Sequence, residues 1–319
     1  MISDRHFVFV LIPRFSLWAL SCAIDALRAA NRDLGNPVYR WTLASIDSDS
    51  VESSSGIALP ASSLATVSDA NVIALCGGDS SHSYRSDDLV RWLRNEARRD
   101  VMIGSLSDGA FVAAAAGLFD HYRSTIHWKC QDAYRLRHPE LDIRASILEI
   151  DRRRFSCAGG TSSLDLMLHF IREDLGTNAV VNITDNYFHD TVRDSSQGQH
   201  LAEAYRHASK SRVLSEALAI MSSNLDQSIS IADISRQAGT SHRSLDRLFQ
   251  RHLGATPGQH FRQLRISRAA TLLTQTGLPV SDIALNCGFS TASHLGRYFR
   301  DIYGLSPNQY RQAERTKTS

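Results

Sequence analysis

Before residue 200, short apolar runs alternate with amphipathic stretches. The runs are FVFVLI (7–12), VYRWTLAS (38–45), NVIALC (71–76) and VMIGSL (101–106), and each is typical of a buried strand. Apolar residues at helical spacing occupy SLWALSCAIDALRAAN (16–31), SDDLVRWLRNEARR (86–99), GAFVAAAAGLF (109–119) and TSSLDLMLHFIRED (161–174). Strands that alternate with helices predict an α/β domain, doubly wound around a mostly parallel sheet.

The last third of the chain contains an internal repeat. The stretch IADISRQAGTSHRSLDRLFQRHLGATP (231–257) recurs, with one inserted residue, as VSDIALNCGFSTASHLGRYFRDIYGLSP (280–307). Each copy predicts a short helix, a turn at Gly239 or Gly288, and a second helix capped by Ser241 or Ser290. Leu and Phe four residues apart are expected to bury one face of each second helix: Leu245 with Phe249, and Leu295 with Phe299. The repeat therefore predicts an all-α domain with two helix-turn-helix units.

Such a unit presents the first outward side chains of its second helix to base edges in the major groove of DNA. The residues expected to face DNA are His242, Arg243, Asp246 and Arg247 in the first copy, and Thr291, Ala292, Ser293, His294 and Arg297 in the second. The intervening stretch 260–276 predicts one helix that spaces the two units. At a separation of ~34 Å, both units would reach consecutive major grooves.

Charge is divided between the two halves of the chain. From Arg212 onward there are 13 Lys and Arg against 7 Asp and Glu, whereas the preceding residues hold 22 against 26. A basic module joined to an acidic one favours a partner such as DNA for the basic part. The alternative is a plain helical bundle with a solvated basic face, although it leaves the repeat unexplained.

Composition limits the class of protein. The chain is 43% hydrophobic and 21% charged, has no long apolar segment, and shows no basic leader with a cleavage site. Its five cysteines form no CxxC pair, so neither a disulfide framework nor a zinc site is expected. We expect a cytoplasmic protein with no membrane span and no metal or other cofactor.

The stretch GSLSDGAF (104–111) has the strand, sharp turn and helix pattern of a nucleophile elbow, with Ser107 at the reactive position. The loops LIPRF, CGGDSS and LSDGA should meet beyond the carboxyl ends of the strands and form a pocket there. The predicted ligand-binding residues are Phe15, Trp18, Gly77, Gly78, Asp79, Ser107, Asp108, His127 and Trp128.

Aromatic rings beside carboxylates suit a cationic group, and backbone amides suit an anionic end. Together they favour a small zwitterion derived from an amino acid. Trp18 could instead belong to the core, and Gly159 and Gly160 could simply form a tight turn.

The second repeat, DIALNCGFSTASHLGRYFRDIYGLSPNQYR, resembles the AraC/XylS family of bacterial transcription regulators from end to end. The first half is similar to the class I glutamine-amidotransferase-like domain of the intracellular-protease superfamily, through FVLIPRFS, ALCGGD, SDGAFVAAAAGLF, STIHW and AGGTSSLDLMLHF. This order resembles the GlxA-type branch of AraC regulators. The stretch NYFHDTVRDSSQGQH is similar to a segment of members that sense arginine, glycine betaine or carnitine.

The resemblance implies roles for particular residues. Ser107 stands where the superfamily's enzymes place a nucleophilic Cys, and His127 stands near the position of their His. The position of the first-helix carboxylate falls near Ala19, in a segment with no acid. A serine nucleophile needs a base within hydrogen-bonding distance, so we expect a retained binding pocket and no enzyme. Asp246 and Ala292 depart from the family pattern, so the operator sequence is not transferable.

The sequence thus predicts a transcription regulator with a sensor domain (1–195), a linker (196–211) and a DNA-binding domain (212–319). Its expected partners are promoter DNA, a small-molecule effector, RNA polymerase and a second copy of the chain, with activation favoured over repression. Two alternatives stay open. One is an amidase or protease with an appended DNA-binding domain, and the other is a first half that serves only for dimerisation.

Overall fold

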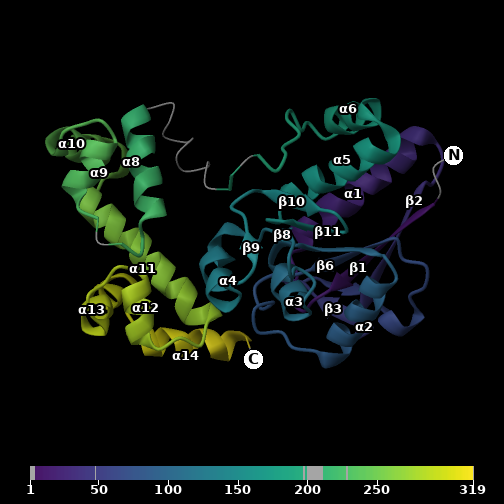
Figure 1. Cartoon of the computed structure of the whole chain (residues 1–319), viewed down its shortest axis with the longest axis horizontal. Coiled ribbons are helices and arrows are strands. Elements are labelled where there is room, and N and C mark those ends of the chain that lie inside the picture. The colour runs from purple at the N-terminus through teal and green to yellow at the C-terminus, as the bar shows by residue number, and fades with distance from the viewer. Residues whose placement is uncertain (1–3, 47, 197, 200–210, 228, 319) are drawn as a thin grey trace. The chain divides into compact units, whose positions relative to one another are not determined.

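A computed structural model divides the chain into two compact units, Met1–Gln199 and His200–Ser319 (Figure 1). The structure describes residues 4–46, 48–196, 198–199, 211–227 and 229–318. Most of the predicted linker, namely 197 and 200–210, lies outside these described residues. Among the described residues, none of the helices is both long and apolar enough to cross a bilayer.

The first unit is built on a seven-stranded sheet with the order β10–β11–β7–β6–β1–β2–β5. Its strands are β1 (Arg5–Leu11), β2 (Tyr39–Ser45), β5 (Ser62–Ser63), β6 (Val72–Cys76), β7 (Met102–Leu106), β10 (Leu148–Asp151) and β11 (Arg154–Cys157). Every neighbouring pair is parallel except β10 with β11. The predicted mostly parallel sheet is therefore confirmed. Strand pairs also join β3 (Ser50–Glu52) to β4 (Ala58–Pro60), and β8 (Arg123–Ser124) to β9 (Asp142–Ile143).

Helices cover both faces of this sheet, with α1, α5 and α6 together on one face and α2 and α3 on the other (Figure 1). Their bounds are α1 (Leu17–Leu34), α2 (Asp87–Arg98), α3 (Ala110–Ala115), α4 (Gln131–Arg137), α5 (Ser162–Leu175) and α6 (Thr177–Asn186). Three 3₁₀ turns, η1 (Leu64–Thr66), η2 (Ser107–Gly109) and η3 (Trp128–Cys130), complete the unit. The predicted α1, α2, α3 and α5 are confirmed, whereas α4, α6 and the β10–β11 pair were not predicted.

The core of the first unit follows from its continuous apolar strands. Every residue of β1 after Arg5 is buried, because helices cover both sides of this central strand. Rings from β1, β2 and α5 meet in one cluster: Phe7 lies 5.9 Å from Tyr39 and 6.3 Å from Phe170 between ring centroids. This packing holds the strand ends in a fixed relation to one another.

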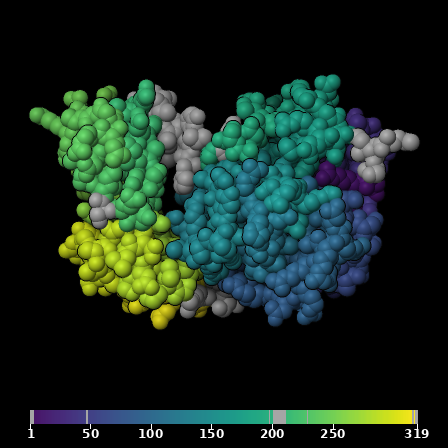
Figure 2. Space-filling view, viewed as in Figure 1, coloured from purple at the N-terminus to yellow at the C-terminus, as the bar shows by residue number. Residues whose placement is uncertain are grey.

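The second unit is entirely helical. It comprises α8 (Arg212–Ser223), α9 (Ile231–Gln237), α10 (His242–Leu253), α11 (Pro257–Gln275), α12 (Val280–Asn286), α13 (Ala292–Tyr303) and α14 (Pro307–Thr318). Helix α11 runs through the middle, with α8–α10 at one end and α12–α14 at the other (Figure 1). In the space-filling view these two groups form separate lobes, one green and one yellow (Figure 2). The predicted single spacing helix is confirmed, and it begins earlier than expected because Thr256 and Gln259 form a capping box around Pro257.

The repeat folds twice in the same way. Gly239 and Gly288 adopt φ angles of 70° and 69°, as the turn requires of a residue without Cβ. The Leu and Phe pairs of α10 and α13 are fully buried, as predicted. The cap of α10 is Ser241 as predicted, but the cap of α13 is Thr291 and not Ser290. The inserted residue of the second copy lies between the turn and the helix, so it moves the cap by one position.

Candidate ligand site and DNA interface

The register of the sheet brings the predicted pocket loops to one edge. Leu11 pairs with Cys76, Cys76 with Leu106, and Leu106 with Cys157. Since these strands are parallel, the loops after β1, β6, β7 and β11 all leave from the same carboxyl edge. The expected meeting of LIPRF, CGGDSS and LSDGA is confirmed, and the loop that holds Gly159 joins them.

Ser107 forms a strained elbow at this edge. Its φ of 54° is unusual for a residue with a Cβ, and its side chain is buried. The opposing loop accommodates it with Gly159, at which a Cβ would lie 2.6 Å from the Cβ of Ser107. Gly77 likewise lets the β6 loop approach, because a Cβ there would lie 2.0 Å from the Gly109 amide nitrogen. Gly159 therefore allows the opposing loop to approach the elbow closely, in addition to forming a tight turn.

The elbow lacks the partners that a serine nucleophile needs. Among the described residues, the Ser107 hydroxyl has no hydrogen-bonding partner, whereas an activated serine is hydrogen-bonded to a base. The first turn of α1 holds no acidic residue, as the sequence indicated around Ala19. His127, the expected base, lies instead in a cluster with Asp108 and Cys130.

The side chains of Asp108, His127 and Cys130 form a cluster at this edge. One nitrogen, oxygen or sulfur atom of each lies within 4.8 Å of those of the other two. The Cys130 thiol donates to Asp108 Oδ2 at 3.2 Å, while Asp108 Oδ1 is buried without a hydrogen-bonding partner among the described residues. Burial raises the pKa of Asp108 to about 7, against the effect of the Cys130 hydrogen bond. Burial, together with the Lys129 charge, lowers the pKa of His127.

Cys130 was not among the predicted site residues. Its spacing of three from His127 was the available signal, because a 3₁₀ turn brings side chains at i and i+3 onto one side. Here His127 caps η3 and accepts a 2.8 Å hydrogen bond at its carbonyl from the Cys130 amide. Nothing in the sequence indicates that Asp108 lies beside this turn.

The glycine amides of the β6 loop are engaged within the fold. The Gly77 amide donates to the Leu106 carbonyl at 3.2 Å, and the Gly78 amide donates to the Ser81 hydroxyl at 2.9 Å. These two amides hold the loop together and are not free for the anionic end of a ligand. Arg14 offers a positive charge nearby, 3.5 Å from Asp79 between Nη2 and Oδ2.

The three predicted aromatic residues differ in exposure. Phe15 is completely buried, and its backbone bridges to Ser53 and Gly78. Trp18 is 65% exposed and Trp128 is 44% exposed, so both rings are accessible to a ligand. The alternative of Trp18 as a core residue is excluded by this exposure. The rings that remain for a cationic group are those of the two tryptophans.

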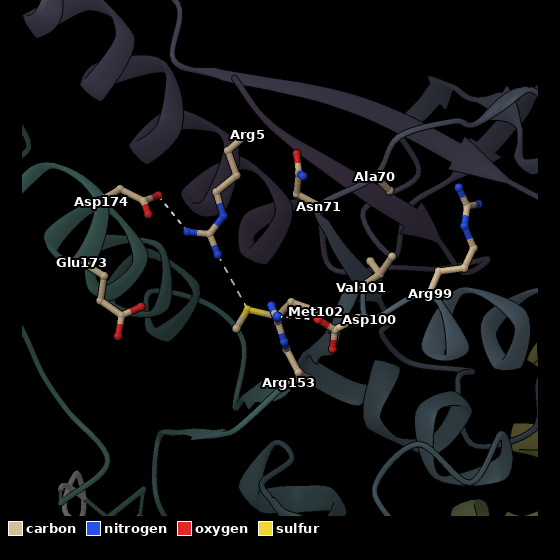
Figure 3. A pocket seen from close by; sticks show the side chains of 10 residues that line it. All are labelled: Arg5, Ala70, Asn71, Arg99, Asp100, Val101, Met102, Arg153, Glu173 and Asp174. Atoms are coloured by element: carbon tan, nitrogen blue, oxygen red, sulfur yellow. Dashed lines mark hydrogen bonds and ion pairs between the residues drawn. The ribbon is translucent and has the colours of Figure 1, made fainter. Parts of the chain in front are cut away.

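A cavity of about 470 Å³ lies at the opposite, amino edge of the sheet (Figure 3). Its basic residues are already paired: Arg5 with Asp174 at 2.7 Å, Arg99 with Glu96 at 3.0 Å, and Arg153 with Asp100 at 2.6 Å. Figure 3 shows Arg5 reaching from β1 towards Asp174 and the Met102 sulfur. We therefore regard this hollow as an ion-paired surface and keep the carboxyl edge as the candidate ligand site.

The segment after α6 is fastened to the first unit by a buried carboxylate. Asp165 on α5, fully buried, accepts hydrogen bonds from Arg193 Nη2 at 2.6 Å and from the Arg193 amide at 2.9 Å, and lies 3.0 Å from His189 Nε2. A buried charge must be paired in this way to be tolerated. The stretch NYFHDTVRDSSQGQH is thus part of the first unit for its described residues.

Gln199, the last residue of the first unit, is anchored to the segments that follow β8 and precede β10. Its side-chain Nε2 donates to the Ile126 carbonyl at 2.8 Å and to the Ser146 carbonyl at 2.7 Å. Its amide donates to the Ala145 carbonyl at 3.0 Å. Ile126 directly precedes His127, so the end of the unit contacts the backbone of the candidate site.

In the second unit, most of the predicted DNA-facing residues lie on the exposed side of α10 and α13. His242, Arg243, Arg247, Thr291, Ser293, His294 and Arg297 are exposed, while Asp246 and Ala292 are half-buried. His242 Nδ1 lies 3.1 Å from Asp246 Oδ2, and Arg297 Nη2 donates to the Tyr298 hydroxyl at 3.0 Å. The Thr291 hydroxyl caps α13 by accepting from the His294 amide at 3.1 Å.

Comparison with known proteins agrees with both units. The model of the DJ-1/PfpI family matches residues 5–173, and a helix-turn-helix domain model matches residues 234–313. The HTH-type transcriptional regulator CdhR of Pseudomonas aeruginosa is 32% identical over 97% of this chain and 92% of its own length. The chain belongs to the AraC/XylS family of transcriptional regulators.

Another relative matches nearly the whole chain, and a solved structure matches part of it. The HTH-type transcriptional regulator GlxA of Rhizobium meliloti is 31% identical over 95% of this chain and 94% of its own. A crystal structure of an AraC family transcriptional regulator from Pseudomonas putida superposes with a TM-score of 0.53 at 27% identity, covering 57% of this regulator and 99% of that chain. The predicted family, fold class and role in DNA-binding regulation are confirmed.

Proposed function

We propose that this regulator is ligand-responsive, and that an effector bound at the carboxyl edge of the first unit alters how the two helix-turn-helix units bind promoter DNA. The observation that carries the proposal is the anchoring of Gln199 to Ile126 and Ser146, which links the candidate site to the end of the sensor. An effector shifts the equilibrium only if it binds one arrangement more tightly than the other. A ligand that moves His127 also moves the neighbouring Ile126 carbonyl, to which Gln199 donates. Such a ligand can therefore bind the two arrangements of the regulator with different affinities.

The effector we propose is an amino acid or a quaternary-amine-like zwitterion. Trp18 and Trp128 are exposed enough for their rings to contact an ammonium or trimethylammonium group, and Lys129 Nζ already lies 5.5 Å from the Trp128 ring centroid. The ion pair between Arg14 and Asp79 suits both ends of a zwitterion, since carboxylate binds the guanidinium and ammonium binds the aspartate. The resemblance of NYFHDTVRDSSQGQH to arginine-, glycine betaine- or carnitine-sensing members supports this class.

On the same proposal, the regulator acts in the cytoplasm as a homodimer and activates transcription by recruiting RNA polymerase to genes of small-metabolite catabolism. The first unit uses its elbow for binding and not for hydrolysis. The absence of a hydrogen-bonding partner for the Ser107 hydroxyl among the described residues supports a non-enzymatic role. The second candidate function is an amidase or protease with an appended DNA-binding domain. The positive φ of Ser107, which is typical of a nucleophile elbow, favours that candidate.

The test is a thermal-shift screen of the full-length regulator against arginine, glycine betaine, carnitine and related amines. We expect a rise in melting temperature with at least one of them, because a ligand that binds only the folded state stabilises it. Trp18→Ala should weaken that shift, whereas Phe188→Ala, which removes another highly exposed ring of the same unit, should leave it unchanged. Ser107→Ala should retain effector-dependent transcription of a reporter.

Coupling is then tested with Gln199→Ala against Ser196→Ala, whose hydroxyl contacts only its neighbour Asp194 among the described residues. The Gln199 variant should still bind effector but lose the transcriptional response, while the Ser196 variant keeps both. A screen without any responding ligand favours a first unit that serves only for dimerisation. Loss of regulation in Ser107→Ala with effector binding intact favours the enzyme.

A further inference from the structure

We propose that Asp108, His127 and Cys130 form a binding site for Zn²⁺ at the carboxyl edge of the sensor. Asp108 belongs to η2, the turn that contains Ser107, whereas His127 caps η3 and Cys130 ends it, and the fold brings these two turns together. Their donors are a carboxylate, an imidazole and a thiolate, the groups that bind Zn²⁺ in proteins. This inference concerns the chain's own residues and does not depend on the class of effector.

The geometry is close to that of a three-ligand zinc site. Zinc bonds of about 2.0 to 2.3 Å at tetrahedral angles place ligand atoms roughly 3.3 to 3.8 Å apart. Cys130 Sγ and Asp108 Oδ2 are already 3.2 Å apart, and all three donors lie within 4.8 Å of one another. His127 and Cys130 stand at i and i+3 around one 3₁₀ turn, so small side-chain rotations close the set.

One buried oxygen atom of the cluster lacks a partner that a cation would supply. Asp108 Oδ1 is buried without a hydrogen-bonding partner among the described residues, which is costly for a carboxyl oxygen. The hydrogen bond from Cys130 reaches only Oδ2, so it does not explain this orphaned oxygen.

The donor set also selects the class of metal. Ca²⁺ and Mg²⁺ prefer oxygen ligands only, whereas one sulfur, one nitrogen and one oxygen suit Zn²⁺. Three protein ligands leave a fourth position for water or for an effector group, as in zinc sites that remain open. A bound Zn²⁺ would require Cys130 as the thiolate, so the thiol proton would be released to solvent.

The experiment measures uptake of Zn²⁺ by the full-length, chelator-treated regulator by calorimetry. We expect one Zn²⁺ per chain at this site, and binding at least about tenfold weaker in both Cys130→Ser and Asp108→Asn. Cys22→Ser is the matched control, since it removes a partly buried thiol of the same unit and should bind as the unaltered protein does. Circular dichroism confirms that each variant is folded.

Co²⁺ gives a second measurement that needs no variant. Substituted into the unaltered regulator, it should show the visible bands of tetrahedral coordination and the near-ultraviolet charge-transfer band of a Co–thiolate bond. The proposal is overturned by an absence of Zn²⁺ uptake, by a Co²⁺ spectrum without thiolate charge transfer, or by equal loss in Cys22→Ser and Cys130→Ser. Each outcome is independent of the amine screen, which is run in the presence of chelator.

Discussion

The two helix-turn-helix units share one framework but differ in how that framework is supported. Both have a left-handed glycine at the turn, a capping hydroxyl, and a buried Leu and Phe on the second helix. Around Gly239 there is open space, since a Cβ there would meet no atom within 4 Å. Around Gly288 the space is filled, because a Cβ would lie 2.7 Å from Arg265 Cζ and 2.9 Å from the Leu225 carbonyl oxygen.

Arg265 accounts for this difference. It projects from α11, donates to the Gly288 carbonyl at 3.3 Å, and also donates to the Gln227 carbonyl beyond the end of α8. Arg265 therefore joins the turn of the second helix-turn-helix copy to the segment that precedes the first copy. The repeated sequence specifies two copies of one motif, and Arg265, which lies outside the repeat, connects them.

The largest expected effect separates the two turn glycines. Gly239→Ala should cost about 1 to 2 kcal/mol in unfolding free energy, since a Cβ is strained at a positive φ. Gly288→Ala should cost about 1 to 3 kcal/mol more, because it also displaces Arg265 and crowds the Leu225 carbonyl. Hydrogen exchange of α9–α10 and α12–α13 in the full chain measures the two losses separately. If Gly288→Ala lowers the exchange protection of α12–α13 no more than Gly239→Ala lowers that of α9–α10, Arg265 does not support the second turn.

The next effect concerns the arginines expected to contact bases. Arg297 donates to the Tyr298 hydroxyl at 3.0 Å, whereas Arg247 has no ion pair or side-chain hydrogen bond among the described residues. Arg297→Ala and Arg247→Ala should each cost about 1 to 3 kcal/mol in specific DNA binding if they read a base. Tyr298→Phe should weaken binding several-fold, because it removes the group that orients Arg297.

The binding site for that measurement is first selected from random DNA with the unaltered regulator, and affinities are then compared at fixed salt. Leu248→Met is the matched control at the equivalent position after Arg247. If Tyr298→Phe binds as tightly as the unaltered regulator, the hydroxyl does not position Arg297. Relaxed preference at different base pairs in the two Ala variants would assign each arginine to its own half of the site.

The smallest effect concerns Asp246, the only acid among the predicted DNA-facing residues. Asp246→Asn should raise non-specific DNA affinity by about 1 kcal/mol or less, because it removes one negative charge from a surface that meets phosphates. Filter binding to a random duplex at low salt measures the gain, and Asp282→Asn on α12 controls for charge alone. An equal gain in both variants would place Asp246 away from the DNA.

The sequence predicted those elements whose burial leaves a clear pattern. Strands β1, β6 and β7 are covered on both faces and read as continuous apolar runs, and the repeat located α9, α10, α12 and α13. The β10–β11 pair was not predicted, because Asp151 and Arg152 at its turn interrupt the apolar pattern of these short strands. Helix α8 lies outside the repeat, although Leu214, Leu218 and Met221 are buried at helical spacing.

The candidate site was predictable in position but not in its contacts. Parallel strands bring their carboxyl ends together, which placed Ser107 and Asp79 at one edge from sequence alone. That Gly77 and Gly78 have their amides engaged, and that Asp108 meets His127 and Cys130, depends on how loops far apart in the chain pack. No local spacing encodes such contacts, because they follow from the shape of the whole unit.

The elbow also bears on how a binding site and a nucleophile site can use the same backbone. The left-handed backbone of Ser107, and the glycine at 159 that makes room for it, are the demanding parts of a nucleophile site, and this regulator retains both. Exchange of one oxygen for one sulfur, Ser107→Cys, would place a thiol there without any rebuilding of the chain.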